Sequence, residues 1–194
     1  MNTIVTETTL HGEVPIDIYQ KLSNDRILFV CDQIDDKLAT DIVATLLLKD
    51  SEAPEEKITL FINSEGGDIR NVLMIYDMIN MIQSPVETVC IGSALDEAAI
   101  LLTAGTPGLR LATKNSIISV GQLVHDWTNY SDLTDAKKIL EQSMGDNKKM
   151  MEIIAKSTGK SFKQANEDFN RRVFMNCNQA IKYGLIDKVI GSNK

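Results

Sequence analysis

Short apolar runs alternate along the first half of the chain with segments whose apolar residues recur every three or four positions. The short runs are rich in β-branched and aromatic side chains and lie at residues 26–31, 58–62 and 86–90. Continuous apolar runs of this kind are typical of strands covered on both faces. The helical spacing predicts helices over about 38–47, 67–82 and 95–103. Because parallel strands need crossover helices, this order predicts an α/β fold with repeated β-α units and a mainly parallel sheet.

The last third of the chain has a different pattern, dominated by one long helix predicted over about 131–157. This helix is too long to pack along its whole length on a small domain. Either one end projects toward a partner, or it is a surface helix with a polar tip. Ser161 and Gln164 have the spacing of a capping box for a further helix. No repeat or linker interrupts the pattern, so we expect a single domain over 1–194.

Composition excludes several classes of function. The 194 residues are 43% hydrophobic and 24% charged, as in an ordinary globular protein, and their net charge is -7. A nucleic-acid-binding protein with this negative net charge would need a local cluster of basic residues to bind phosphates, and the sequence has no basic run. No apolar run approaches the ~20 residues that span a bilayer, and no export signal opens the chain. We therefore expect a cytoplasmic protein with no nucleic-acid or membrane partner.

Histidine and cysteine usage limits the chemistry further. His11 and His125 are the only histidines, which excludes a His-rich metal site and leaves little imidazole for acid–base catalysis. The three cysteines, Cys31, Cys90 and Cys177, are far apart, form no CxxC pair and lie in or beside apolar runs. This pattern favours buried free thiols over a redox or metal role.

Two strand-to-helix turns carry the candidate chemistry. In Asn63-Ser-Glu-Gly-Gly-Asp68, paired glycines expose backbone amides that favour an anion or a developing oxyanion. A tight turn in which Asp68 complements the helix dipole explains the same residues. The second turn, Gly92-Ser-Ala-Leu-Asp-Glu97, has the G-x-x-x spacing of a nucleophile elbow. It has Asp96 where a serine would be poised, and Ser93 lies three residues earlier, where the chain is still leaving the strand.

Several further motifs follow one another in order along the chain. They are Gly12-Glu13 with Asp17-Ile-Tyr19, Phe61-Ile-Asn-Ser-Glu-Gly-Gly67, Ile75-Tyr-Asp77, Leu101-Leu-Thr-Ala-Gly105, Asn115-Ser116, Thr158-Gly159 and Tyr183-Gly-Leu-Ile-Asp187. Together they resemble the proteolytic subunit of the ATP-dependent Clp protease (the ClpP family), which is related in fold to crotonases. The resemblance covers essentially all of the chain, with a small insertion after Gly121. It implies a serine endopeptidase that needs no cofactor.

The residues at the family's catalytic positions differ in this chain. The family serine follows G-x-x-x, where this sequence has Asp96, and the family's N-S-x-x-x-x-H-Q segment puts Gly121 at the place of the histidine. Arg172 stands where the family has its orienting aspartate. A carboxylate is no activated hydroxyl, glycine accepts no proton, and arginine does not orient an imidazole as a carboxylate does.

The resemblance marks Gly67 and Glu97 as the residues of an oxyanion-type site, beside which Glu65 replaces the family's proline with an opposing charge. With no imidazole between them, Arg172 is long enough to reach Asp96. One hypothesis is therefore that the vacated site holds a structural ion pair between them, and the alternatives are pairs of Arg172 with Glu65, Asp68 or Glu97.

Two other interpretations keep some chemistry in the chain. Ser93 as nucleophile with His125 as base would relocate the site, although His125 lies four residues past the family position. A divalent cation would need the carboxylates of Glu65, Asp68, Asp96 and Glu97. Solvated carboxylates at two helix N-termini explain the same residues without a metal.

The resemblance also implies an assembly. ClpP-like subunits form seven-membered rings that stack in pairs as a tetradecamer, and the helix over 131–157 would make the ring-to-ring contact. Phe61 and Met81 fall at aromatic positions of a pocket that receives loops of a AAA+ unfoldase. Three functions stay open: a catalytically silent subunit in a mixed particle with an active paralogue, which the substitutions favour; an active peptidase with a Ser93/His125 site; and a non-catalytic ring that acts alone.

Overall fold

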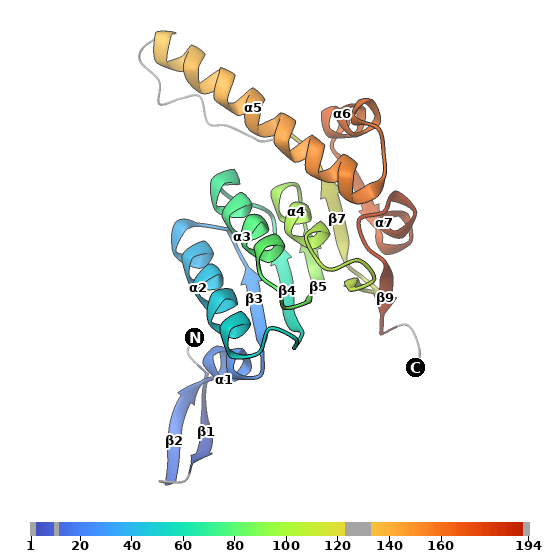
Figure 1. Ribbon diagram of the computed structural model, residues 1–194. Coiled ribbons are helices and arrows are strands. Elements are labelled where there is room, and N and C mark those ends of the chain that lie inside the picture. The colour runs from blue at the N-terminus through green and yellow to red at the C-terminus, as the bar shows by residue number, and fades with distance from the viewer. Residues whose placement is uncertain (1–2, 10–11, 123–132, 192–194) are drawn as a thin grey trace.

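The computed structural model describes residues 3–9, 12–122 and 133–191, and a mainly parallel sheet lies at its centre (Figure 1). The main path of the sheet is β3 (Ile27–Cys31), β4 (Ile58–Ser64), β5 (Val86–Ala94), β6 (Arg110–Thr113) and β9 (Lys188–Ile190), with every neighbouring pair parallel. The next strand, β7 (Ile117–Val120), pairs parallel with the C-terminal end of β5, whereas β6 pairs with an earlier part of β5. On its other side β7 pairs antiparallel with β8 (Val173–Asn176). The predicted α/β fold with a mainly parallel sheet is confirmed.

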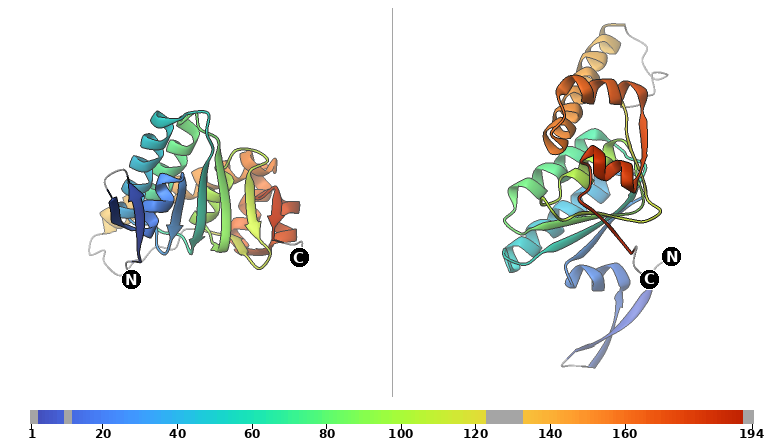
Figure 2. Two further views of the ribbon diagram at one scale, coloured as in Figure 1. Left: turned by 90° about the horizontal axis from the view of Figure 1, so that it is seen from below. Right: turned by 90° about the vertical axis from the view of Figure 1, so that its right-hand side faces the viewer.

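Three crossover helices lie on one face of this sheet (Figure 2). They are α2 (Asp36–Glu52), α3 (Ile69–Met81) and α4 (Glu97–Thr103). The main core lies between these helices and the strands, where Leu60 and Ile62 of β4 and Val72 and Ile75 of α3 are fully buried. All three helices were predicted from their apolar spacing. Helix α3 begins two residues later than expected, because Asp68 caps its first turn instead of belonging to it.

The opposite face of the sheet is only half-buried within one chain. Burial alternates along β3 and β4, so that residues facing the helices are buried and those between them are not. On the second face Phe29 stacks on Phe61 with ring centroids 5.3 Å apart, and Tyr19 packs edge-on against Phe29 at 5.4 Å. The expectation of strands covered on both faces is therefore wrong for the single chain. The runs are continuous because this second, partly open face is apolar as well.

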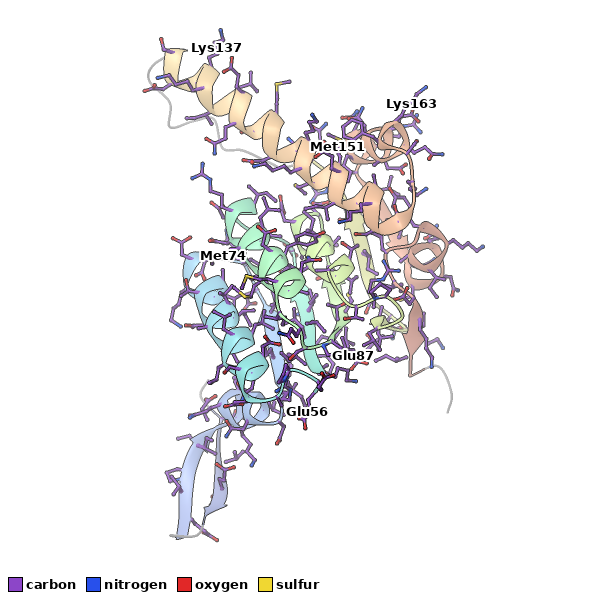
Figure 3. The ribbon with its side chains drawn as sticks, in the orientation of Figure 1. Glu56, Met74, Glu87, Lys137, Met151 and Lys163 are labelled. Atoms are coloured by element: carbon purple, nitrogen blue, oxygen red, sulfur yellow. The ribbon has the colours of Figure 1, made fainter. Side chains whose placement is uncertain are left out.

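The long helix α5 (Leu133–Thr158) extends beyond the body of the molecule, as Figure 1 shows, and Figure 3 places Lys137 at its outer end. Its inner part contributes Met150 and Ile154 to the core, whereas Leu140 and Met144 are 46% and 63% exposed. Of the two interpretations of this helix, the projecting one is confirmed. The chain returns through α6 (Phe162–Arg171), whose Ser161–Gln164 capping box is present as predicted, and α7 (Cys177–Tyr183).

An N-terminal hairpin was not predicted. It consists of β1 (Ile4–Thr9) and β2 (Gly12–Asp17), which pair antiparallel and lie apart from the main sheet (Figure 1). Helix α1 (Ile18–Asn24) follows, with Asp17 accepting a hydrogen bond from the Tyr19 amide. The hairpin escaped prediction because only Val14 and Ile16 show an alternating apolar pattern, and two positions are too few to indicate a strand.

The three cysteines are free thiols, as their pattern in the sequence predicts. Cys90 and Cys177 are buried and Cys31 is half-buried, and none of the three forms a disulfide. Within the described ranges, no helix combines the length and the hydropathy that a bilayer crossing requires.

Candidate functional site

The two candidate turns lie side by side, because they follow neighbouring parallel strands. Ser64 at the end of β4 is in register with Ala94 at the end of β5, and the amide of Leu95 donates to the Ser64 carbonyl at 3.0 Å. Both turns therefore open at the carboxyl edge of the sheet, which is where α/β proteins place their sites.

The glycine turn after β4 packs tightly against the backbone of Ile34. Gly66 has a φ of +112°, and a side chain at Gly67 would collide with the backbone of Ile34, whose nitrogen lies 2.6 Å from the position of a Cβ. The Ile34 amide donates to the Gly66 carbonyl at 3.0 Å, and the Asp68 amide donates to the Ile34 carbonyl at 3.1 Å. Both glycines are required by this geometry, whatever the turn binds.

A cleft of about 660 Å³ opens beside this turn. Its lining is polar and consists of Asp32, Gln33, Asn63, Ser64, Glu65, Gly66, Gly67 and Ser93. Ser93 lies within β5, as expected, and its hydroxyl donates to Asn63 Oδ1 at 3.3 Å. Its proposed partner His125 lies outside the described residues, as does His11.

The elbow after β5 holds Asp96 in an unusual conformation. Its φ of 48° and ψ of -103° fall in a region that side chains rarely adopt, which costs on the order of 1–3 kcal/mol. The surroundings hold it there, since its amide donates to the Ser119 carbonyl at 3.1 Å and the Ser119 hydroxyl donates to Asp96 Oδ1 at 2.9 Å. Asp96 is 4% exposed. The backbone thus forms a sharp strand-to-helix elbow with a carboxylate at its apex.

Arg172 meets this carboxylate from a distant part of the sequence. It caps α6 in a left-handed conformation, and its Nη2 donates to Asp96 Oδ2 at 2.5 Å. The guanidinium also lies over the Phe174 ring, 5.6 Å from its centroid. The Asp96 side chain is 5% exposed and that of Arg172 is 49% exposed. The expected ion pair is confirmed, and no ion pair links Arg172 to the competing carboxylates in the described part of the chain.

Gly121 provides the space for this pair. The antiparallel register of β7 and β8 aligns Ser119 with Phe174 and Val120 with Val173, which brings Gly121 next to Arg172. A Cβ at position 121 would lie 2.6 Å from Asp96 Oδ1 and 2.7 Å from Arg172 Cγ. Any side chain there would collide with the pair. The structure therefore brings together all three residues that the sequence singled out, with the arginine filling the space beside the glycine.

Glu97, the first residue of α4, turns its carboxyl toward the glycine turn. It is 8% exposed, and its carboxyl lies so close to Gly66 that a methyl group on that glycine would overlap Oε2. Burial raises the pKa of Glu97 to about 7, and the Asp96 carboxylate adds to the rise. Hydrogen bonds from the backbone amides of Glu97 and Gly67, together with the Arg172 guanidinium, oppose it.

The four carboxylates of the cation hypothesis do not converge. Glu65 and Asp68 are exposed, whereas Asp96 and Glu97 are buried. Asp68 accepts from the Arg70 amide at 2.8 Å, as the tight-turn interpretation predicts. Among the residues that the structure describes, no three carboxylate, histidine or cysteine side chains come close enough together to hold a metal ion.

Phe61 and Met81 lie on different sides of the chain. Phe61 belongs to the half-open sheet face, while Met81 ends α3 in the helical layer and is 65% exposed. Within one chain they do not form a single pocket.

Sequence reasoning missed Ser119, which holds both the backbone and the carboxylate of Asp96. A signal was present, because Ser119 is the one hydroxyl in the apolar run Ile117-Ile-Ser-Val120 and is fully buried. A buried hydroxyl needs a partner, and the sequence could not name that partner because Asp96 lies on another strand.

Two strand-to-helix turns side by side at the carboxyl edge of a mainly parallel sheet define an α/β protein with a candidate site at that edge. Comparison with protein-family models matches the Clp protease family over residues 10–193. Two curated relatives are the ATP-dependent Clp protease proteolytic subunit 1 of Tropheryma whipplei (strain Twist) and the subunit 2 of Tropheryma whipplei (strain TW08/27). Each is 37% identical over 188 residues, which cover 97% of this chain and 91% of the relative. The chain belongs to the Clp protease family.

Proposed function

We propose that this chain is a Clp protease subunit with no peptidase activity of its own, which works in a mixed particle with an active paralogue. The observation that carries the proposal is the Asp96–Arg172 ion pair, packed against Gly121 at the elbow. If these three residues stand at the family's catalytic positions, the nucleophile, the base and the orienting carboxylate are all replaced. In their place stands an ion pair that stabilises the fold.

The local chemistry supports this proposal. Asp96 already accepts hydrogen bonds from Arg172 and Ser119, so its carboxylate is neutralised and held in place. A peptide carbonyl brought to this elbow would meet a buried salt bridge and not an activated hydroxyl.

The surface supports a role in assembly. One sheet face stays half-open and aromatic, and α5 projects with Leu140 and Met144 exposed. Apolar surfaces of this kind are typical of protein–protein contacts. Phe61 and Met81 lie on opposite layers, so an unfoldase-docking pocket that uses both requires two neighbouring subunits.

A peptidase assay tests the catalytic part of the proposal. The purified chain and an active relative are compared on short fluorogenic peptides and with a serine-reactive phosphonate probe. We expect neither turnover nor labelling by this chain alone. Turnover or labelling would refute the proposal, and loss of that activity in Ser93→Ala with the probe on Ser93 would establish the relocated site.

Native mass measurement tests the assembly. The chain is measured alone and after co-expression with a Clp proteolytic paralogue from the same genome. We expect mixed particles that contain both chains. Stable rings of this chain alone that exclude the paralogue would instead support the third function, a non-catalytic ring that acts by itself.

A further inference from the structure

Among the residues that the structure describes, Glu97 is the one buried carboxylate near the site that the ion pair does not use. Its carboxyl fills the space above Gly66, which is open only because that residue has no side chain. The backbone amides of Gly67 and of Glu97 itself lie close enough to oppose the rise of its pKa. These are the two positions that the family resemblance marks as oxyanion-type donors. A side chain of the protein itself therefore stands beside the two amides that would face a bound carbonyl.

The charged groups around Glu97 are few. Asp96 precedes it on the same elbow and Arg172 reaches the elbow from the end of α6, while Glu65 is exposed on the glycine turn. Because Arg172 donates to Asp96, the neighbouring backbone amides of Gly67 and Glu97 are the polar groups that stabilise the ionised Glu97 carboxyl most. A buried carboxyl held by amides has the same chemistry as a bound carboxylate ligand.

We propose that the Glu97 carboxyl is an internal ligand of the Gly66–Gly67 turn, and that it keeps this turn closed to the carbonyl or carboxylate groups of a bound peptide. The inference rests on the proposed function in taking this turn as the peptide-facing part of the site. It adds an occupied glycine turn to the differences at Asp96, Gly121 and Arg172. Restoring the three catalytic side chains would leave the oxyanion donors occupied.

Chemical rescue with a small carboxylate tests the contact. Glu97→Ala removes the internal ligand and leaves a space of the right size and polarity for acetate. In 100 mM sodium acetate, compared with sodium chloride of equal ionic strength, we expect the thermal midpoint of Glu97→Ala to rise by about 2–4 °C. The wild type and Glu97→Gln, whose side chains still fill the space, should not respond. Glu65→Ala is the matched control, because it removes an exposed carboxylate from the same turn.

Hydrogen exchange of peptides that cover residues 63–68 gives a second measurement. We expect exchange in Glu97→Ala to be about tenfold faster or more than in the wild type, with acetate restoring protection. In the wild type, protection corrected for the intrinsic exchange rate should rise as the pH falls from 7 to 4.5, because the protonated carboxyl is buried against the turn at lower cost, and Glu97→Gln should show no such change. This wild-type comparison remains decisive if Glu97→Ala does not fold.

Equal acetate responses in the wild type and Glu97→Ala would overturn the inference. So would unchanged protection of residues 63–68 in Glu97→Ala, or the same pH dependence in the wild type and Glu97→Gln. None of these measurements uses peptidase activity. Turnover by the wild type would refute the proposed function without touching them, and failed rescue would refute the internal ligand while leaving the proposed function intact.

Discussion

The Asp96–Arg172 pair makes a quantitative prediction about stability. Arg172→Ala leaves a carboxylate whose side chain is 5% exposed with one side-chain partner, the Ser119 hydroxyl. Breaking a fully buried pair from one side costs about 3–5 kcal/mol, and water that enters where the half-exposed guanidinium lay reduces the expected cost to about 2–3 kcal/mol. Asp96→Ala should cost less, about 1 kcal/mol, because the released guanidinium can turn toward solvent.

The double variant should cost less than the sum of the two single changes, because no unpaired buried charge remains. We expect a coupling energy of about 1–3 kcal/mol. The assay is reversible urea unfolding of all four proteins, followed by circular dichroism at one fixed subunit concentration. The matched control is the cycle on Lys37–Asp41, whose side chains are 87% and 64% exposed. Its coupling should not exceed about 0.5 kcal/mol.

Additive effects at Asp96 and Arg172, within about 0.5 kcal/mol, would refute the reasoning. The pair would then be a contact without energetic weight, and the conformation of Asp96 would need another cause. Repeating both cycles at 1 M salt distinguishes a partly buried ion pair from a solvent-exposed one. Because one end is buried, we expect most of the coupling to survive, whereas the control coupling should vanish.

Three further predictions concern single positions. Gly121→Ala puts a methyl group into the ion pair and should cost about 1–3 kcal/mol, measured by thermal unfolding. An unfolding free energy of Gly121→Ala equal to that of the wild type would contradict the close packing of Gly121 against the ion pair. Glu97 has its pKa raised from 4.5 to about 7, so the wild type should lose up to about 3 kcal/mol of stability as the pH rises from 4.5 through 7. Glu97→Gln should remove this dependence on pH. Equal slopes of unfolding free energy against pH in the wild type and Glu97→Gln would contradict the prediction. Burial would raise the pKa of Asp187, but hydrogen bonds from Arg110 lower it overall. Asp187→Asn should therefore destabilise the protein at pH 7, and the difference should shrink as the pH falls through the pKa of Asp187; a constant difference would refute this.

Much of the fold follows from short-range patterns. The three- and four-residue spacing of apolar positions in α2, α3 and α5 depends on residues within a few turns of each other, so it is legible in the sequence. Capping is local as well, which is why the Ser161–Gln164 box was found. Elements without a strong apolar period were missed, namely the hairpin of β1 and β2, the short helix α1 and the short strand β8.

The candidate site divides along the same line. Asp96, Gly121 and Arg172 were identified from motifs along the chain. Whether they meet depends on the pairing of β7 with β8 and on the left-handed turn at Arg172, which join segments 76 residues apart. The ion pair was expected as one of several competing arrangements, and only the structure selected it.

The sequence by itself determined the α/β fold, the positions of the two turns and the three residues, Asp96, Gly121 and Arg172, that we propose stand at the family's catalytic positions. Those properties depend on residue identity and local spacing. The tertiary structure decided that Arg172 fills the space beside Gly121, that Ser119 holds Asp96, and that the Glu97 carboxyl closes the glycine turn. It also decided that one face of the sheet stays half-open. Side chains from different strands meet only once strand register and crossover connections are set. A local sequence pattern does not specify these contacts, because the residues involved are far apart along the chain.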